Sequence, residues 1–241
     1  MVAISSDSVY GCFYWLWAPS RKPDTTRSKP SDFRCFTYRL CGRSRKWKTT
    51  LSLSLLSLIS YTGSITVDGI EVRDIPRDQF PSLFTVIPQE PIVFRTATIR
   101  QNLIPNEIVN PGNYEGYESI MYRVLYGVGL LKIVQKNGGL QSKFSKLKLS
   151  YEQLARFSIA QGLMLYYFMR TPLALVEGAT NNVSGESLVR MRTIMREVFG
   201  PGGCAIISMV HYQEMVSGAS WIGRVAEGTV TPPQLPPPVG A

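Results

Sequence analysis

Apolar and polar positions alternate with a helical period after Ser150. Apolar or small residues recur every three or four positions between 154 and 164, which predicts a helix with one buried face. Ser150 and Gln153 form an S-x-x-Q capping box, which predicts where this helix begins. Residues 173–176 then form a short, unbroken apolar run that ends at Glu177. This pattern is typical of a central parallel strand with a carboxylate at its carboxyl end.

Other segments extend the pattern of alternating strands and helices. Apolar runs at 84–87 and 205–210 predict two more buried strands. Residues 63–72 alternate and contain an Asp-Gly pair, which predicts an antiparallel hairpin. Residues 51–59 predict a helix, and residues 104–148 predict helices joined by polar loops. Strands that alternate with helices indicate the α/β class.

The composition limits the classes of protein to which this chain can belong. A chain of 241 residues with 44% hydrophobic content is long enough for one α/β domain with its own core. Its apolar runs are far shorter than the roughly 20 residues that a membrane helix needs, so we expect no membrane span in this chain. The four cysteines have neither CxxC spacing nor a neighbouring histidine cluster, which argues against a zinc site or a disulfide framework.

The net charge of +9 is concentrated near the N-terminus. Residues 21–48 contain ten Lys or Arg against two Asp. A basic segment with aromatic residues can bind nucleic acid, but its prolines and its Ser/Thr content favour a solvated arm, so we expect no nucleic-acid partner. We therefore expect residues 1–41 to form a divergent, poorly ordered basic and aromatic arm. Residues 231–241 predict a flexible proline-rich tail.

Four motifs in order resemble those of ATP-binding-cassette (ABC) transporter nucleotide-binding domains. Residues 149–153 (LSYEQ) resemble the LSxGQ signature, and residues 175–180 (LVEGAT) resemble the Walker B segment LxLDEAT. Residues 86–94 and 98–103 resemble the Q-loop block, and Val210-His211 resembles the switch-histidine loop. The amino-acid sequence of the Q-loop block is most similar to that of the second nucleotide-binding domain of multidrug-resistance-associated (C-subfamily) transporters.

This resemblance implies a fold and a domain layout. The fold is a P-loop NTPase-like ABC cassette with a mostly parallel core sheet, an antiparallel β subdomain and a helical subdomain that carries the signature. The nucleotide-binding domain would span residues 42–230, and its N-terminal part is incomplete because residues 1–47 have no convincing counterpart in the family. The family function is ATP binding and hydrolysis that drive transport across a membrane.

The family's Walker A loop, GxxxxGK[ST], corresponds to residues 42–50. Trp47 stands where the family has the glycine before the lysine, and a glycine there lets backbone N–H groups approach phosphates closely. The alternative is that Lys48 merely begins an ordinary amphipathic helix. The cofactor-binding residues that the resemblance implies, with ATP and Mg²⁺ as the cofactors, are Gly42, Lys48, Thr49, Thr50, Ser150 and Gln153.

The resemblance also implies residues for hydrolysis. Catalytic roles fall to Gln89, Glu177 and His211, and Mg²⁺ would be held by Thr49, Gln89 and Glu177. Gly178 stands where the family has its catalytic glutamate, and Glu152 replaces a signature glycine whose N–H faces the γ-phosphate. Losing such a carboxylate costs on the order of 10² to 10⁴ in rate. We therefore expect this chain to be impaired in ATP hydrolysis.

The resemblance further implies partners and a location. The partners are a second nucleotide-binding domain and an ABC transmembrane domain, at the cytoplasmic face of a membrane; without them the chain would be cytoplasmic. Two alternatives stay open on the sequence. The chain could be a non-catalytic interaction or regulatory module that keeps the fold, or a truncated relic of a transporter.

Overall fold

A computed structural model describes residues 2–5, 37–41, 45–61, 64–67, 70–104, 116–180, 183, 185–201, 204–210, 221–226 and 229–230. Within these residues the strands form a six-stranded sheet and a three-stranded sheet. The chain is therefore α/β with an additional small β-sheet, which confirms the predicted fold class.

The larger sheet is almost entirely parallel. Its order is β5-β6-β7-β2-β8-β9, and only the β8–β9 pair is antiparallel. The strand bounds are β2 Thr37–Cys41, β5 Phe84–Ile87, β6 Leu173–Glu177, β7 Ala205–Val210, β8 Trp221–Ala226 and β9 Thr229–Val230. The strands predicted at 84–87, 173–176 and 205–210 are confirmed.

The smaller sheet is antiparallel. Strand β3 (Ser64–Val67) lies between β1 (Val2–Ser5) and β4 (Ile70–Glu71). The predicted hairpin at 63–72 is therefore confirmed for the β3–β4 pair, and its Asp-Gly turn lies outside the described residues.

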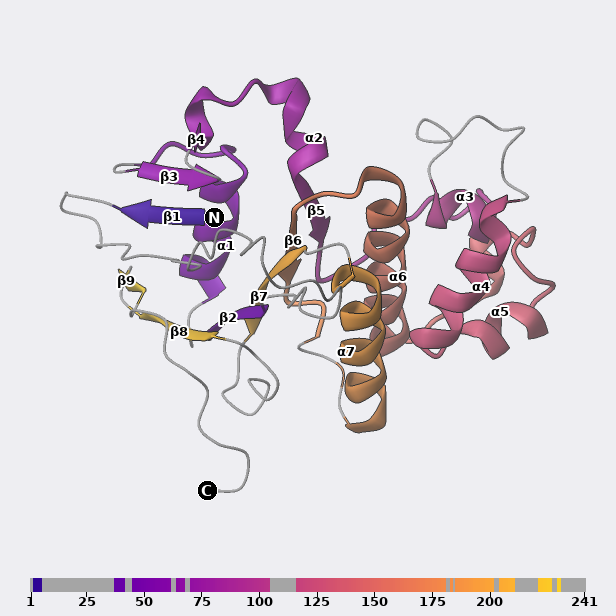
Figure 1. Cartoon of the computed structure of the whole chain (residues 1–241). Coiled ribbons are helices and arrows are strands. Elements are labelled where there is room, and N and C mark those ends of the chain that lie inside the picture. The colour runs from indigo at the N-terminus through magenta and orange to yellow at the C-terminus, as the bar shows by residue number, and fades with distance from the viewer. Residues whose placement is uncertain are drawn as a thin grey trace, which may run out of the picture.

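Helices pack on both faces of the larger sheet, with α1 on one face and α6 and α7 on the other. Their bounds are α1 Arg45–Leu55, α2 Phe80–Leu83, α3 Ile99–Leu103, α4 Glu118–Gly127, α5 Leu131–Lys136, α6 Tyr151–Met169 and α7 Gly185–Phe199, with 3-10 turns η1 Val72–Asp74, η2 Arg77–Gln79 and η4 Phe144–Lys146. Helices α6 and α7 pack side by side, with α4 against both (Figure 1). In the part of the chain that is described, no helix is long and apolar enough to cross a bilayer.

Strand β6 is buried on both faces, which explains its unbroken apolar sequence. Leu175 belongs to a core with Leu51 and Leu55 of α1. Val176 belongs to a second, larger core with residues of α4, α6 and α7, among them Phe157. Successive residues of a strand point to opposite faces, so β6 must be apolar at every position between these two layers.

Helix α6 approaches β5 very closely at Gly162. A Cβ atom at this position would lie 2.7 Å from Cδ1 of Ile87. Only glycine therefore allows this spacing between helix and strand. The contact fixes α6 against the end of β5, since Ile87 is the last residue of that strand.

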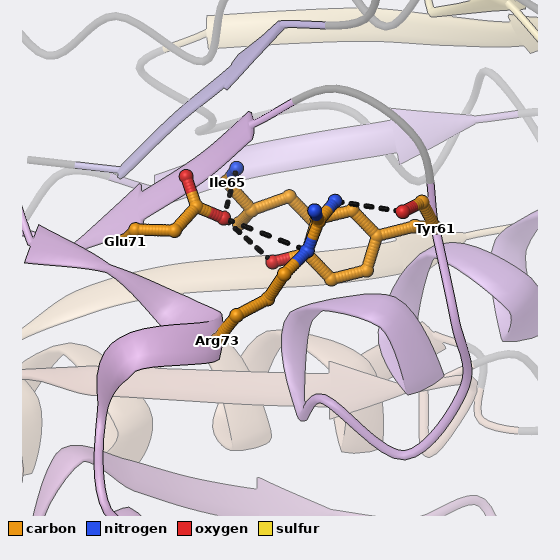
Figure 2. A network of polar contacts seen from close by, with 4 residues as sticks. All are labelled: Tyr61, Ile65, Glu71 and Arg73. Atoms are coloured by element: carbon orange, nitrogen blue, oxygen red, sulfur yellow. Dashed lines mark hydrogen bonds and ion pairs between the residues drawn. The ribbon is translucent and has the colours of Figure 1, made fainter.

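A polar network joins the segment after α1 to the small sheet (Figure 2). An oxygen of Glu71 accepts hydrogen bonds from the hydroxyl of Tyr61 at 2.8 Å and from the backbone N–H of Ile65 at 3.1 Å. The guanidinium of Arg73 donates to the backbone carbonyl of Tyr61 at 2.7 Å and lies over its ring. Burial, then the hydrogen bond and charge of Glu71, raise the pKa of Tyr61 to about 12.

Two details of the sequence analysis need correction. Residues 37–41, placed in a poorly ordered arm, form β2 between β7 and β8, and residues 2–5 pair with β3. A domain boundary at residue 42 therefore cuts the core sheet. The helix predicted at 51–59 begins and ends earlier, as α1 spans Arg45–Leu55. The proline-rich tail predicted at 231–241 lies outside the described residues.

The close contact at Gly162 predicts a strongly position-dependent effect of alanine. Gly162→Ala should lower the free energy of unfolding, because overpacking costs about 1–3 kcal/mol, which outweighs a helix-propensity gain of at most ~1 kcal/mol. Ile87→Val in the same chain should recover part of the loss. Urea unfolding measures both. Gly116→Ala is the control, since nothing lies within 4 Å of its added Cβ atom; equal losses at Gly162 and Gly116 would refute the packing explanation.

The Tyr61 network predicts a pH-dependent stability. A folded pKa above the unfolded value of about 10 means that the stabilisation is complete below pH 10 and is lost as the pH rises toward 12. Tyr61→Phe should therefore be less stable than the wild type near pH 9, and the gap should shrink by about pH 11.5. Denaturant unfolding at both pH values measures this. Tyr126→Phe, at an exposed site, should show no such gap.

Candidate functional site

The carboxyl ends of the central strands meet at one edge of the larger sheet. Ile87, the last residue of β5, pairs with Val176, so Glu177 extends just beyond it. Val210 and Cys41, the last residues of β7 and β2, pair with each other. In parallel α/β sheets this edge is where ligands bind, because loops and helix N-termini gather there.

Helix α1 begins directly after this edge. It starts at Arg45, so Arg45, Lys46 and Trp47 are helical where the family pattern predicts a loop. The first four N–H groups of a helix have no partner within it and face the ligand side of such an edge. Thr49 is exposed and Thr50 is half-buried within the same helix.

Glu177 supplies the carboxylate at the edge. It ends β6 with a half-buried side chain. The next residue, Gly178, is buried and has a φ of 67°. Residues with a Cβ atom adopt such a backbone conformation only with strain. The glycine is therefore suited to a sharp turn, and a glutamate there would be conformationally costly.

Gln89 lies beside the start of α6. Its side-chain amide donates to the hydroxyl of Tyr151 at 3.3 Å, and that hydroxyl donates to a carboxylate oxygen of Glu90 at 3.0 Å. The loop after β5 is thus tied to the first residue of the helix that carries the signature-like motif. The sequence analysis did not single out Tyr151, because a tyrosine at a variable motif position gives no signal on its own.

Two further side chains of α6 hold the same loop. The hydroxyl of Ser158 donates to the carbonyl of Pro88 at 2.6 Å. The amide of Gln161 donates to the carbonyls of Ile92 and Asn102, each at 2.8 Å. Helix α6 therefore binds the loop along much of its length and then leads into β6.

The predicted capping box at the start of α6 is confirmed. The hydroxyl oxygen of Ser150 accepts from the N–H of Gln153, and the side chain of Gln153 accepts from the N–H of Ser150. Glu152 forms an ion pair with Arg156 one turn later, at 3.8 Å. These side chains stabilise the helix terminus; a role in binding nucleotide remains a prediction.

Only some of the other predicted site residues lie in the part of the chain that the structure describes. Gly42 and His211 lie outside the described residues, as does the side chain of Lys48. Thr49, Gln89 and Glu177 are described, and of these Gln89 contacts α6. Their oxygen atoms are of the kind that Mg²⁺ prefers. No group of three or more His, Cys, Asp or Glu that could hold a metal occurs within the described ranges.

Comparison with known proteins gives consistent matches. The sequence model of the ABC transporter family matches residues 36–169. The chain is 30% identical over 161 residues to ABC multidrug transporter B of Aspergillus fumigatus, covering 66% of this chain and 10% of that protein. It is 28% identical over 173 residues to ABC transporter gloK of Glarea lozoyensis, covering 71% and 12%. The chain thus spans about a tenth of the length of these relatives.

A solved structure shares the fold. A bacterial Atm1-family ABC exporter with ATP bound aligns with a TM-score of 0.68 at 18% sequence identity. The alignment covers 82% of this chain and 33% of the exporter chain. At this identity the similarity concerns the arrangement of strands and helices.

Proposed function

The chain belongs to the ABC transporter family, and we propose that it is a nucleotide-binding domain that binds ATP with Mg²⁺ and hydrolyses it poorly. The observation that carries this proposal is the convergence of the ends of β5, β6, β7 and β2 at one edge, with α1 starting directly after β2. A helix N-terminus next to a carboxylate at such an edge suits a phosphate with a bound divalent cation.

Each residue of the edge has a distinct role in this proposal. The backbone N–H groups at the start of α1 and the ammonium group of Lys48 bind phosphate oxygens. Thr49, Gln89 and Glu177 would hold Mg²⁺ through their side-chain oxygen atoms, and the ion would neutralise charge on the phosphates. Gln89 and His211 orient the terminal phosphate and the water near it.

Three features support impaired hydrolysis. Trp47 continues α1 in place of a glycine-rich loop, so fewer N–H groups can surround the phosphates. Gly178 supplies no carboxylate to orient the attacking water, and its φ of 67° opposes any side chain there. Glu152 places a negative charge in the signature-like motif, where a partner's γ-phosphate would approach.

The proposal includes partners and a location. A second nucleotide-binding domain would complete the nucleotide site, and a transmembrane domain would contact the loop after β5, at the cytoplasmic face of a membrane. The sequence of the Q-loop block supports a resemblance to the second nucleotide-binding domain of C-subfamily transporters. The features that impair hydrolysis equally favour a non-catalytic regulatory module that pairs with an active cassette.

Binding of nucleotide can be measured directly. A fluorescent ATP analogue with Mg²⁺ should bind the purified chain, and Lys48→Ala should weaken binding by about tenfold or more, since a charge-assisted hydrogen bond contributes ~1.5–3 kcal/mol. Trp47→Gly should tighten binding by shortening α1 at its N-terminus. Lys132→Ala, an exposed lysine on α5, is the control. Equal affinities for the wild type and Lys48→Ala would contradict the site.

Hydrolysis is a separate measurement. Phosphate release from ATP with Mg²⁺ should not exceed the background of the Lys48→Ala variant, because the carboxylate expected at residue 178 is missing. Gly178→Glu should not restore turnover on its own, since φ at this residue is unfavourable for glutamate. Turnover by the wild type that Lys48→Ala abolishes would overturn the proposal of impaired catalysis.

A further inference from the structure

Two large side chains are exposed on the neighbouring helices α4 and α7. Tyr126 of α4 is 67% exposed and Val189 of α7 is 60% exposed. The opposite faces of both helices are buried in the larger core, so the two side chains are held outward by fixed elements. Single exposed apolar residues are common on protein surfaces. These two therefore matter only if one surface joins them and if its charges suit a partner.

Helices α4 and α7 do form one continuous surface. A Cβ atom on Gly127 of α4 would lie 2.6 Å from a side-chain atom of α7, so the helices approach each other closely. A guanidinium nitrogen of Arg123 lies 3.9 Å from a carboxylate oxygen of Glu197. Arg190 is close enough to Tyr126 for the two side chains to interact electrostatically. The contacts advance along α4 as they recede along α7, so the helices run antiparallel and share one outer face.

The charged residues of this face are of the kind found at protein interfaces. Helices α4 and α7 contain arginine but no lysine, whereas both cations of α5 are lysines. Tyrosine and arginine are enriched at protein–protein interfaces and lysine is depleted there, because a guanidinium group loses its water more readily and pairs with carboxylates in a fixed geometry. We call this surface the α4/α7 face, and its exposed residues are Arg123, Tyr126, Glu186, Val189, Arg190 and Glu197.

The α4/α7 face carries charges of both signs. Arg190 donates two hydrogen bonds to one carboxylate oxygen of Glu186, at 2.7 Å from Nη2 and 3.1 Å from Nε. Arg123 and Glu197 form the second pair. A strongly acidic or strongly basic partner would meet repulsion as well as attraction on such a surface. A second copy of the same face, related by a two-fold axis, can place each acid opposite a base.

We propose that the α4/α7 face binds a second copy of this chain about a two-fold axis close to Val189. The two α7 helices cross antiparallel there, so Glu186 of each copy faces Arg190 of the other. Tyr126 of each copy packs beside this crossing. The carboxylates and guanidinium groups then exchange partners within one helix for partners across the interface, and no charge is left buried without a partner.

This dimer goes beyond the proposed function. It uses the outer face of α4 and α7, not the sheet edge or the first turn of α6, and it needs no nucleotide. Its size sets the expected strength. Helices of 10 and 15 residues are roughly 15 and 22 Å long, which gives a face at the small end of specific protein interfaces. We therefore expect a reversible dimer that dissociates on dilution.

The test is sedimentation of the full chain without nucleotide, from about 1 to about 200 μM, which brackets the dissociation constants of small reversible interfaces. The wild type should pass from monomer to dimer over this range. Glu186→Arg leaves only positive charge at the crossing, and Arg190→Glu leaves only negative charge, so each variant alone should remain a monomer. An equimolar mixture of the two variants should form a heterodimer, because their faces then have opposite charge.

A combined variant and two outcomes keep this test decisive. Glu186→Arg with Arg190→Glu in one chain restores complementary charges and should dimerise as the wild type does, which also shows that the single variants fail through charge and not through misfolding. A wild type that stays a monomer over the whole range would overturn the proposal. Failure of the two single variants to associate on mixing would overturn it as well.

Further variants decide whether association uses the α4/α7 face. Tyr126→Ser and Val189→Ser should each raise the dissociation constant of the dimer by about threefold or more, because each removes apolar area from the interface. Lys132→Glu with Lys136→Glu changes the charge of exposed positions on α5 and should dimerise as the wild type does. Equal losses in the α5 and α7 variants would contradict the proposal, since association would then follow overall charge.

Nucleotide measurements separate this proposal from the proposed function. Arg190→Glu should bind the fluorescent ATP analogue as the wild type does, because this residue lies on the α4/α7 face and not at the sheet edge. A chain that dimerises through the face but binds no nucleotide keeps the dimer and loses the nucleotide site. A dimer that forms only with ATP and Mg²⁺ would overturn the proposal made here, since association would then depend on the nucleotide.

Discussion

The burial of β6 on both faces is the constraint on which the rest of the structure depends. Its residues alternate between the core that contains α1 and the core that contains α6. A strand in that position has no tolerance for polar side chains until it leaves the two layers, which happens at Glu177. Burial on both faces explains why the strand is an unbroken apolar run that can be predicted from the sequence. It also explains why the first charged residue, Glu177, stands at the edge where the neighbouring strands end.

Patterns that depend on local chemistry could be predicted from the sequence, whereas long-range contacts could not. The apolar runs of β5, β6 and β7 and the capping box of α6 are local, and each was found at the predicted residues.

Strand β2 was missed because its five residues include Arg39 and follow a strongly basic stretch, which hides the short alternation. The bond from Gln89 to Tyr151 joins residues 62 positions apart, and no spacing rule indicates it. Of the candidate nucleotide site, the strand end with Glu177 was predictable, but the early start of α1 depends on packing against the sheet.

Helix α6 connects the loop after β5 with strand β6. Its first turn contacts Gln89 and Glu90, its middle holds the loop that presents Ile92, and its end leads into β6. Gly162 brings this helix into close contact with Ile87 of β5. A partner that contacts the loop after β5, as proposed above, would therefore bind next to a helix that leads into β6.

Such an arrangement can transmit a binding event without hydrolysis. Coupling between two sites requires only that ligand binding at one site favours a position of α6 that the other site also favours, and the coupling free energy is reciprocal. A carboxylate at residue 178 contributes to the rate of bond cleavage but not to this linkage. The positive φ of Gly178 and the contacts that α6 makes with the loop after β5 involve different residues of the chain. A domain of this kind can lose turnover and still respond to nucleotide, provided that the contacts of α6 remain intact.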